Sequence, residues 1–325
     1  MGAPGRPHRR HRRRRPGARR RAVTASVIVP AYNARTTITG CLAALTAQRT
    51  RAAFEVIVVD SSDDGTGELV RARFPGVRLV ALARRTLPGA ARNVGVEVAR
   101  GEILAFTDAD CVPEPTWLDA MLREHAAGAY AAVGGAVLNA KPRAVVAWCD
   151  YLVEFSAQLP SAGRRLVDML PTCNLSVPRQ VFARYGPFPA TVPASEDRLF
   201  CWRLARAGER LLFEPGIRVR HVCRARLGAY LRHQRGLGRG AAAARLRVDL
   251  PQAWLARGPA RVLAPLLRLL VLEARLLRRD RPNFVRFNAL LPLCLLGLAA
   301  WGIGFCEGGA PAAASAAARC PCDPR

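Results

Sequence analysis

Two aspartates separated by a single residue offer the first chemistry in this sequence. Asp108 and Asp110 follow the apolar run 103–106, and side chains at positions i and i+2 of an extended chain point the same way. Two carboxylates this close repel each other unless a cation lies beside them. Mg²⁺ or Mn²⁺ suits a few carboxylates combined with phosphate oxygens. The pair therefore predicts a divalent-metal site, and the alternative is an ordinary turn with two solvated acids.

The segments around this pair alternate between strands and helices. Alternating and apolar patterns predict strands at 26–30, 55–60, 77–82 and 102–108, with helices at 34–48, 67–74 and 89–100 between them. This order predicts an α/β fold with a mostly parallel sheet and helices on both faces. Ligands bind at the carboxyl ends of such strands, and these ends carry Asp60, Asp108 and Asp110.

Four motifs follow one another along the chain. They are SVIVPAYNA (26–34), VIVVDSSDDGT (56–66), PGAARNVGVEVARGEILAFTDADCVP (88–113) and SEDRLFCWRLARAGERLLFEPGIRVRH (195–221). In this order and spacing they resemble the family 2 glycosyltransferases, and the resemblance runs from about Val23 to Arg226. It implies a GT-A fold, which is a Rossmann-like α/β sheet that binds a nucleotide-sugar donor.

The resemblance also implies which residues hold the donor. The loop after the first strand would hold the nucleotide, and Asp60, with Asp63 or Asp64, would accept hydrogen bonds from the base or ribose. Arg92 and Asn93 would contact the nucleotide or its phosphates, and Asn174 would lie at the sugar-binding wall 172–175. The alternatives are an Asx-turn around Gly65 for the acidic turn and a surface position for Arg92. The implied donor site comprises Pro30, Ala31, Tyr32, Asn33, Asp60, Asp63, Arg92, Asn93, Asp108 and Asn174.

The same resemblance assigns the metal and the catalytic base. Asp110, with Asp108 nearby, would hold a Mg²⁺ or Mn²⁺ ion that stabilises the charge of the departing diphosphate. Asp197 would take the proton of the attacking hydroxyl, with Glu196 shaping the contacts to the acceptor or sugar. Acids in a first helical turn also favour the helix dipole, which is the alternative for this pair. His221 would approach the metal or a phosphate, or else serve a structural role.

Charge and cysteine content narrow the possible classes of protein and the compartment in which it works. The chain has a formal net charge of +26, and residues 1–21 carry ten arginines and no acid. We interpret 1–22 as a disordered tail, with binding to anionic lipid or nucleic acid as the alternative. No nucleic-acid-reading motif occurs. The cysteines form no CxxC pair, which indicates free thiols in a reducing compartment, and no apolar run after the arginines predicts a signal peptide.

The carboxyl-terminal third predicts a membrane anchor. Residues 287–305 are 19 consecutive uncharged residues, long enough for a bilayer core of about 30 Å. Arginines cluster just before this span, which predicts a single pass with that side cytosolic. The stretch 262–279 has the pattern of an interfacial amphipathic helix. Packed helices of a soluble domain are the alternative for both segments.

These observations predict five segments and one reaction. An inverting, metal-dependent glycosyltransferase would move a sugar from a nucleotide-sugar to a hydroxyl acceptor, with a lipid-linked acceptor suggested by the anchor, at the cytosolic face of the cell membrane. A QxxRW signature is missing, which favours a single transfer over polymer synthesis. The alternatives are a nucleotide-sugar-binding protein without turnover and a basic nucleic-acid-binding protein. The predicted segments are a tail (1–22), a GT-A catalytic domain (23–226), a helical juxtamembrane segment (227–283), a transmembrane helix (284–306) and a flexible tail (307–325).

Overall fold

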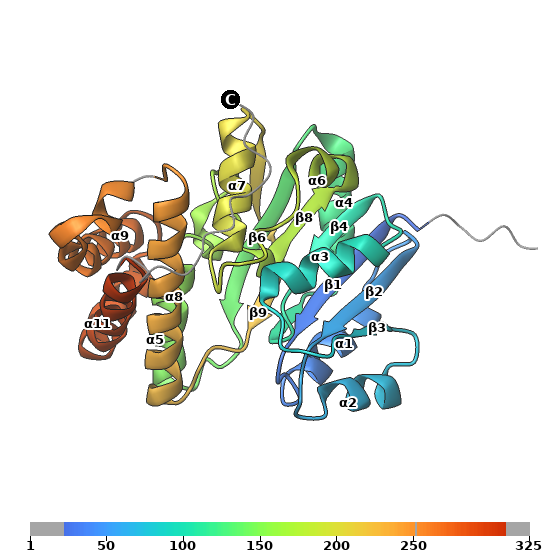
Figure 1. Cartoon of the computed structure of the whole chain (residues 1–325), viewed down its shortest axis with the longest axis horizontal. Coiled ribbons are helices and arrows are strands. Elements are labelled where there is room, and N and C mark those ends of the chain that lie inside the picture. The colour runs from blue at the N-terminus through green and yellow to red at the C-terminus, as the bar shows by residue number, and fades with distance from the viewer. Residues whose placement is uncertain (1–22, 251, 310–325) are drawn as a thin grey trace, which may run out of the picture.

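A central sheet with helices on both faces forms the body of the molecule (Figure 1). The computed structural model describes residues 23–250 and 252–309, so the predicted tail 1–22 and residues 310–325 of the predicted tail 307–325 lie outside the described residues, while 307 and 308 belong to the last helix. Within that part of the chain, nine strands form one sheet in the order β3-β2-β1-β4-β8-β6-β9-β5, with β7 paired to β9. The strands are β1 (Ala25–Ala31), β2 (Phe54–Asp60), β3 (Arg78–Ala81), β4 (Ile103–Phe106), β5 (Cys111–Pro113), β6 (Ala132–Asn139), β7 (Arg165–Leu166), β8 (Leu175–Pro178) and β9 (Leu211–His221).

The first half of the sheet is parallel and the second half is mixed. Strands β3, β2, β1 and β4 pair in parallel, as the sequence pattern predicts. Beyond β4, β8 runs antiparallel to both β4 and β6, whereas β9 runs parallel to β6 and antiparallel to β5. The α/β prediction with helices on both faces is confirmed, and the parallel arrangement holds for the amino-terminal half.

Alternate side chains of the central strands feed two separate cores. In β1, Val27 and Val29 face the core beneath α1, α2, α4 and α5, whereas Ile28 faces the core beneath α3, α6 and α7. Each strand is therefore apolar on both sides, which explains its continuous hydrophobic run. The helices are α1 (Ile38–Thr46), α2 (Thr66–Arg73), α3 (Pro88–Val98), α4 (Trp117–Ala127), α5 (Val145–Phe155), α6 (Arg179–Tyr185) and α7 (Glu196–Arg206).

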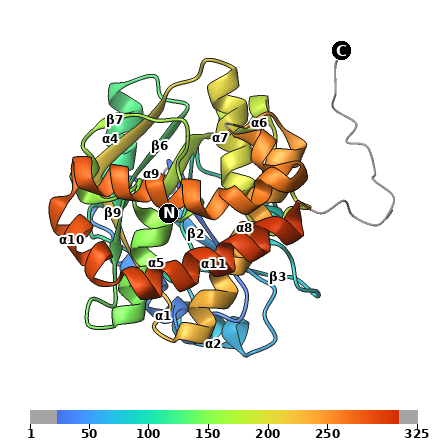
Figure 2. The same cartoon turned by 90° about the vertical axis from the view of Figure 1, so that its left-hand side faces the viewer.

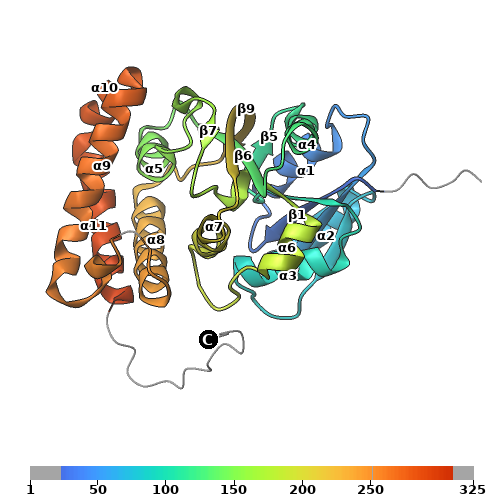
Figure 3. The same cartoon turned by 90° about the horizontal axis from the view of Figure 1, so that it is seen from above.

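A further helical layer covers the side of the molecule beyond α5. It consists of α8 (Leu227–Arg247), α9 (Ala264–Arg279), α10 (Arg281–Ala289) and α11 (Leu291–Gly308). In Figures 2 and 3 the last three helices lie together against α5 and α8. Of the described helices, α11 alone is long and apolar enough to cross a membrane, and 39% of its apolar window is buried inside the molecule.

The predicted span 287–305 is not one helix. Helix α10 ends at Ala289, Leu290 links the helices, and α11 begins at Leu291 with Pro292 in its first turn, where the missing proline N–H costs nothing. Residues 287–289 therefore belong to α10. The structure thus shows an 18-residue apolar helix that is partly packed on the protein, which is weak evidence for a membrane association.

Helix α11 packs closely on α8 because glycines remove the side chains between them. A β-carbon on Gly304 would overlap the carbonyl oxygen of Arg235, and one on Gly238 would overlap that of Trp301. At the end of α11, Glu307 accepts hydrogen bonds from Arg235 and Arg239 on α8. The two helices are therefore joined along their length by backbone contact and ion pairs.

This close approach predicts that Gly304→Ala destabilises the fold. Overpacking a tight contact costs about 1–3 kcal/mol, which urea unfolding would report as a lower free energy of unfolding. Gly236→Ala on α8 is the matched control, because a β-carbon there meets nothing within 4 Å, and it should stabilise by about 0.5–1 kcal/mol. Equal effects of the two substitutions would contradict the close contact.

Candidate active site

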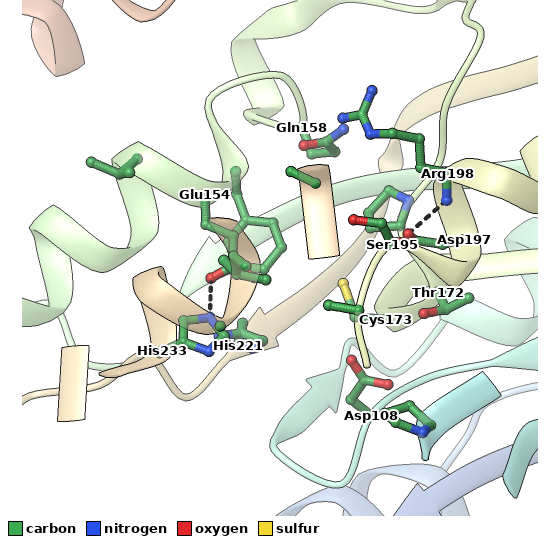
Figure 4. A pocket seen from close by; sticks show the side chains of 18 of the residues that line it. Asp108, Glu154, Gln158, Thr172, Cys173, Ser195, Asp197, Arg198, His221 and His233 are labelled. Carbon is green, nitrogen blue, oxygen red and sulfur yellow. Dashed lines mark hydrogen bonds and ion pairs between the residues drawn. The ribbon is translucent and has the colours of Figure 1, made fainter. Parts of the chain in front are cut away.

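A cavity of about 1430 Å³ lies beyond the carboxyl ends of β1 and β4. Figure 4 shows its central part, with Asp108 at one end, Arg198 at the other and Asp197 between them. The walls come from loops that are distant in sequence: the turn after β1, the Asp108–Asp110 loop, the segment 171–173, the start of α7 and the segment after β9. The cavity therefore gathers Asp108, Asp110 and the start of α7 into one space, whereas Asp60, the third predicted strand-end acid, does not line it.

Arg92 joins two of the predicted acids. It lies on α3 with only 2% of its surface exposed, and its two terminal nitrogens donate to Asp108 Oδ1 (2.5 Å) and Glu196 Oε1 (2.6 Å). Glu196 is itself 6% exposed. A planar guanidinium with forked donors suits two carboxylates at once. The surface alternative for Arg92 is wrong, and its charge is directed at acids of this chain.

Asp197 is a predicted acid with a raised pKa. It lines the cavity in the first turn of α7 and accepts one hydrogen bond from the backbone N–H of Arg198 (2.7 Å). Burial, and then repulsion from the neighbouring Glu196 carboxylate, raises the pKa of Asp197 to about 7. The preceding residue, Ser195, has a φ of +72°, a conformation uncommon outside glycine that turns the chain into the helix. A carboxylate with this pKa can accept a proton near neutral pH.

Asp110 and His221 converge because β5 and β9 are in register. Cys111 pairs directly with His221 in the antiparallel ladder, so the residue before Cys111 lies beside the imidazole. His221 Nε2 is 3.5 Å from Asp110 Oδ2, and a guanidinium nitrogen of Arg224 is 3.8 Å from the same oxygen. Within the described residues, ligand atoms of Asp110, Cys111 and His221 lie within 4.8 Å of one another.

The donor set fits a hard divalent cation. Cis ligands of an octahedral ion with bonds of about 2.0–2.1 Å lie about 3 Å apart, close to the separation between His221 and Asp110. The oxygens of Asp110 and the free oxygen of Asp108 are the ligand type that Mg²⁺ and Mn²⁺ prefer. Burial raises the pKa of Asp108, the charge of Arg92 opposes this shift, and Asp110 adds to it. This repulsion between acids is what a bound cation relieves.

The predicted nucleotide loops are held to each other. Pro30, Ala31, Tyr32 and Asn33 line the cavity, and Tyr32 stacks beneath the guanidinium of Arg85 at 4.6 Å. The backbone N–H of Asn33 donates to Ser62 Oγ (2.8 Å), while its side-chain oxygen accepts from the N–H of Asp63 (3.2 Å). The turn 60–66 is therefore fixed against the loop after β1.

Asp60 and Asp63 lie in this turn, beside the cavity wall and not in it. Asp60 is buried and accepts hydrogen bonds from the N–H and hydroxyl of Ser62. Asp64 makes the same type of Asx-turn with Thr66. The Asx-turn interpretation therefore describes Asp60 and Asp64 in this structure, while Asp63 keeps its carboxylate free of any described hydrogen bond.

Two predicted donor residues lie elsewhere and require correction. Asn93 donates to the carbonyl of Phe188 and accepts from its N–H, which ties α3 to a loop 95 residues away. Asn174 is 0% exposed and bridges Trp117 Nε1 to the carbonyls of Ala136 and Ile217. Neither residue lines the cavity. Both amides satisfy buried polar groups of the fold, and the neighbouring Thr172 and Cys173 form the wall instead.

Sequence analysis missed a second group of charged residues in the same cavity. Glu154 on α5 and His233 on α8 are hydrogen-bonded at 2.9 Å, although 79 residues separate them. Burial favours a higher pKa for Glu154, but His233 and Arg224 outweigh it and lower the pKa to about 2. Arg224 also contacts the fully buried Asp150 at 3.6 Å. No local spacing signals these contacts, because each pair joins separate helices or strands.

Two solved structures share this architecture. The mannosyltransferase PcManGT from Pyrobaculum calidifontis, in complex with GDP-Man and Mn2+, matches with a TM-score of 0.59 and 21% identity, over 87% of this chain and 86% of that one. TarS from S. aureus matches with a TM-score of 0.51 and 18% identity, over 88% and 90%. These likenesses show that the chain has the GT-A fold.

Sequence comparison gives the family. The profile of "Glycosyl transferase family 2" matches residues 26–173. Glycosyltransferase AglE of Haloferax volcanii is 33% identical over 221 residues, 66% of this chain and 72% of AglE. The pre-mycofactocin glycosyltransferase of Mycobacterium tuberculosis is 28% identical over 163 residues, 48% of this chain and 34% of that protein. The chain belongs to glycosyl transferase family 2, which confirms the resemblance drawn from the four motifs.

The buried Arg92 predicts a large loss of stability in Arg92→Met. Removing one member of a buried ion-pair group leaves uncompensated charge and costs about 3–5 kcal/mol, which chemical unfolding would measure. Arg100→Met is the matched control, because Arg100 is 60% exposed in its pair with Glu55, and exposed pairs contribute about 0–1 kcal/mol. A loss from Arg92→Met no larger than that of the control would show that Arg92 is not a structural cation.

Proposed function

We propose that the chain transfers a sugar with inversion to a hydroxyl acceptor, using Asp197 as the general base. The observation that carries this proposal is a carboxylate with a pKa of about 7 in the same cavity as the Asp108–Asp110 pair. In a direct displacement, the acceptor oxygen attacks the anomeric carbon while the bond from that carbon to the diphosphate oxygen breaks. The hydroxyl proton goes to Asp197, and the electron pair leaves with the nucleoside diphosphate.

Asp110 and His221 would hold a divalent metal, with Asp108 as a further ligand through the oxygen that Arg92 leaves free. When bound, the ion supplies positive charge to the departing diphosphate. Arg224 stands beside Asp110 and can donate to the same phosphate oxygens. The PcManGT structure contains Mn2+ and GDP-Man, which supports a metal and a nucleotide diphosphate donor at the corresponding end of this fold.

The donor nucleotide would bind at the loop after β1. Tyr32 is 41% exposed there and offers a ring face, and the stacked Arg85 adds positive charge. Asp63 has a carboxylate that can accept hydrogen bonds from the base or ribose. In this proposal the nucleotide would lie over β1 and β2, with its diphosphate at Asp110 and its sugar toward Asp197.

The acceptor would reach the site from a membrane surface. Helix α11 is apolar enough to enter a bilayer, and α9 exposes leucines on its outer side, at Leu266, Leu270 and Leu277. Arginines of α9 and α10 border these helices and suit the cytosolic leaflet, whose surface is anionic. We therefore place the catalytic domain on the cytosolic side of the cell membrane, with a lipid-linked hydroxyl compound as the acceptor.

The dependence of nucleotide binding on a divalent metal should disappear in Asp110→Ala. Wild-type protein should bind UDP or GDP more tightly with Mn²⁺ than without it, because Asp110 and the diphosphate would share the ion. Isothermal titration in both conditions would measure this difference. Asp119→Ala, an acid on α4 away from the cavity, is the control and should retain it. The metal assignment would have to be withdrawn if Asp110→Ala kept the same metal dependence as wild type.

Loss of the general base should slow turnover without weakening the binding of the donor. Asp197→Asn keeps the shape of the side chain but cannot accept a proton, and such losses typically cost about 10² to 10⁴ in rate. Donor affinity should stay near the wild-type value. A variant that lost nucleotide binding yet turned over normally at saturating donor would make Asp197 a donor ligand and pass the role of base to Glu196.

The pH profile offers an independent check of the same residue. The base acts only when deprotonated, so the rate should fall as pH drops through about 7, the pKa of Asp197. Glu196→Gln removes the repulsion that helps raise this pKa and leaves Arg92 less neutralised. The acidic limb of the rate profile should therefore move to lower pH in this variant. An unchanged limb in Glu196→Gln would exclude Asp197 as the titrating group.

A further inference from the structure

The cavity extends beyond Asp197 into a part with a different character. There it is bounded by α7, α8, α9 and α11 and by the segment that leads into β7. Six arginines from these elements line it, and none of them forms a salt bridge with a carboxylate in the described part of the chain. We call this group the arginine lobe: Arg165, Arg198, Arg245, Arg268, Arg275 and Arg279.

Neutral groups hold most of these guanidinium groups in place. Arg268 donates to the carbonyl of Val153 (2.9 Å) and lies 4.5 Å from the ring centroid of Trp301. Arg275 donates to Ser156 Oγ (2.8 Å). Such partners fix the geometry but leave the positive charges uncompensated. The remaining bonds are from Arg165 to the carbonyls of Ala157, Ala162 and Gly163, and from Arg245 to the carbonyl of Ala241.

The arginines also disfavour one another's charge. Burial lowers the pKa of Arg268 to about 10; attraction to Glu154 opposes this shift, and repulsion from Arg198 and Arg245 adds to it. Burial and repulsion from Arg198 likewise lower the pKa of Arg245 to about 10. The Nε of Arg245 is buried and has no hydrogen-bond partner. A buried donor without an acceptor costs free energy, and an anion in the lobe would remove both this cost and the repulsion.

We propose that the arginine lobe binds a phosphate group of the acceptor, so that the acceptor is a phosphate ester whose hydroxyl faces Asp197. This inference rests on the function proposed above and specifies its acceptor. Phosphate oxygens accept several forked guanidinium bonds at once. The lobe is separate from the donor diphosphate end of the cavity: in Figure 4, Arg198 and Asp108 lie on opposite sides of Asp197.

Within the described residues no acid of the cavity forms a salt bridge with these arginines, although the charge of Glu154 offsets part of the effect of burial on Arg268. Glu154 is paired with His233, Asp197 lies toward the donor, and Asp168 is exposed at the edge. Helix α9 points Arg268 and Arg275 inward while Leu266 and Leu270 stay exposed on the outside. One helix therefore offers both a phosphate site and an apolar outer face, which favours a phosphate carried on a lipid over one in solution.

Binding of full-length protein to vesicles tests this proposal. Phosphatidylcholine vesicles would contain polyprenyl phosphate, the matching polyprenol, or phosphatidylglycerol, and flotation would give the affinity. Polyprenyl phosphate should bind at least about tenfold more tightly than either other lipid, the loss expected for one charge-assisted contact. Arg198→Gln and Arg275→Gln should each weaken it by about tenfold. Arg278→Gln on α9, outside the cavity, is the control and should change it less than about twofold.

Two further measurements distinguish a lipid-borne phosphate from a soluble one, and the acceptor proposal from the proposed function. Geranyl phosphate in solution that competes fully would show a soluble phosphate acceptor in the same lobe. Equal binding of polyprenol and polyprenyl phosphate, or an equal loss in Arg278→Gln, would overturn the proposal in favour of general membrane attraction. If Arg275→Gln fails to fold, Arg198→Gln still tests the proposal, because the side chain of Arg198 makes no hydrogen bond with the described residues. Mn²⁺-dependent GDP or UDP binding, measured on each variant, reports the donor site, so its failure in wild type would count against the proposed function alone.

Discussion

A buried guanidinium bonded to two carboxylates holds the catalytic half of this protein together. Arg92 lies on α3, Asp108 follows β4, and Glu196 begins α7, so a single side chain joins three elements spread over 104 residues. Without the cation, two acids at the edge of the apolar core would face each other unpaired, at high cost. The position of Asp108 relative to α7 follows from this contact, and with it the position of Asp197.

The cavity is divided by the sign of its charges. One end carries the acids Asp108 and Asp110, whose negative charges attract a cation, and the other carries the arginine lobe, whose positive charges attract an anion. Asp197 lies between the two ends, where burial and a neighbouring acid raise its pKa to about 7. A donor with a metal and an acceptor with a phosphate would each neutralise its own end, so both substrates would be oriented by charge before their reacting atoms meet.

The sequence predicts the local parts of this structure and not the contacts between distant ones. Strand runs and the two aspartates are readable because burial and side-chain direction follow from neighbouring positions. The Arg92–Glu196 pair is not readable, since only the folded sheet brings these residues together. Asn93 and Asn174 were misassigned because a motif position does not reveal whether an amide meets a ligand or a buried backbone group. The helix break at Leu290 is not predicted from the sequence, because the apolar run continues through it.

The irregularity between β6 and β9 has a consequence for the evolution of the site. Gly135 pairs with Glu214, but Ala136 pairs with Arg218, so three residues of β9 loop out of the ladder. From Ile217, the last residue of the bulge, buried positions alternate with exposed ones through Val219 and His221. An insertion or deletion inside the bulge can be absorbed there, whereas one residue added after it would rotate His221 to the opposite face. A change of length inside the bulge would therefore leave the imidazole of His221 on the same face of the sheet.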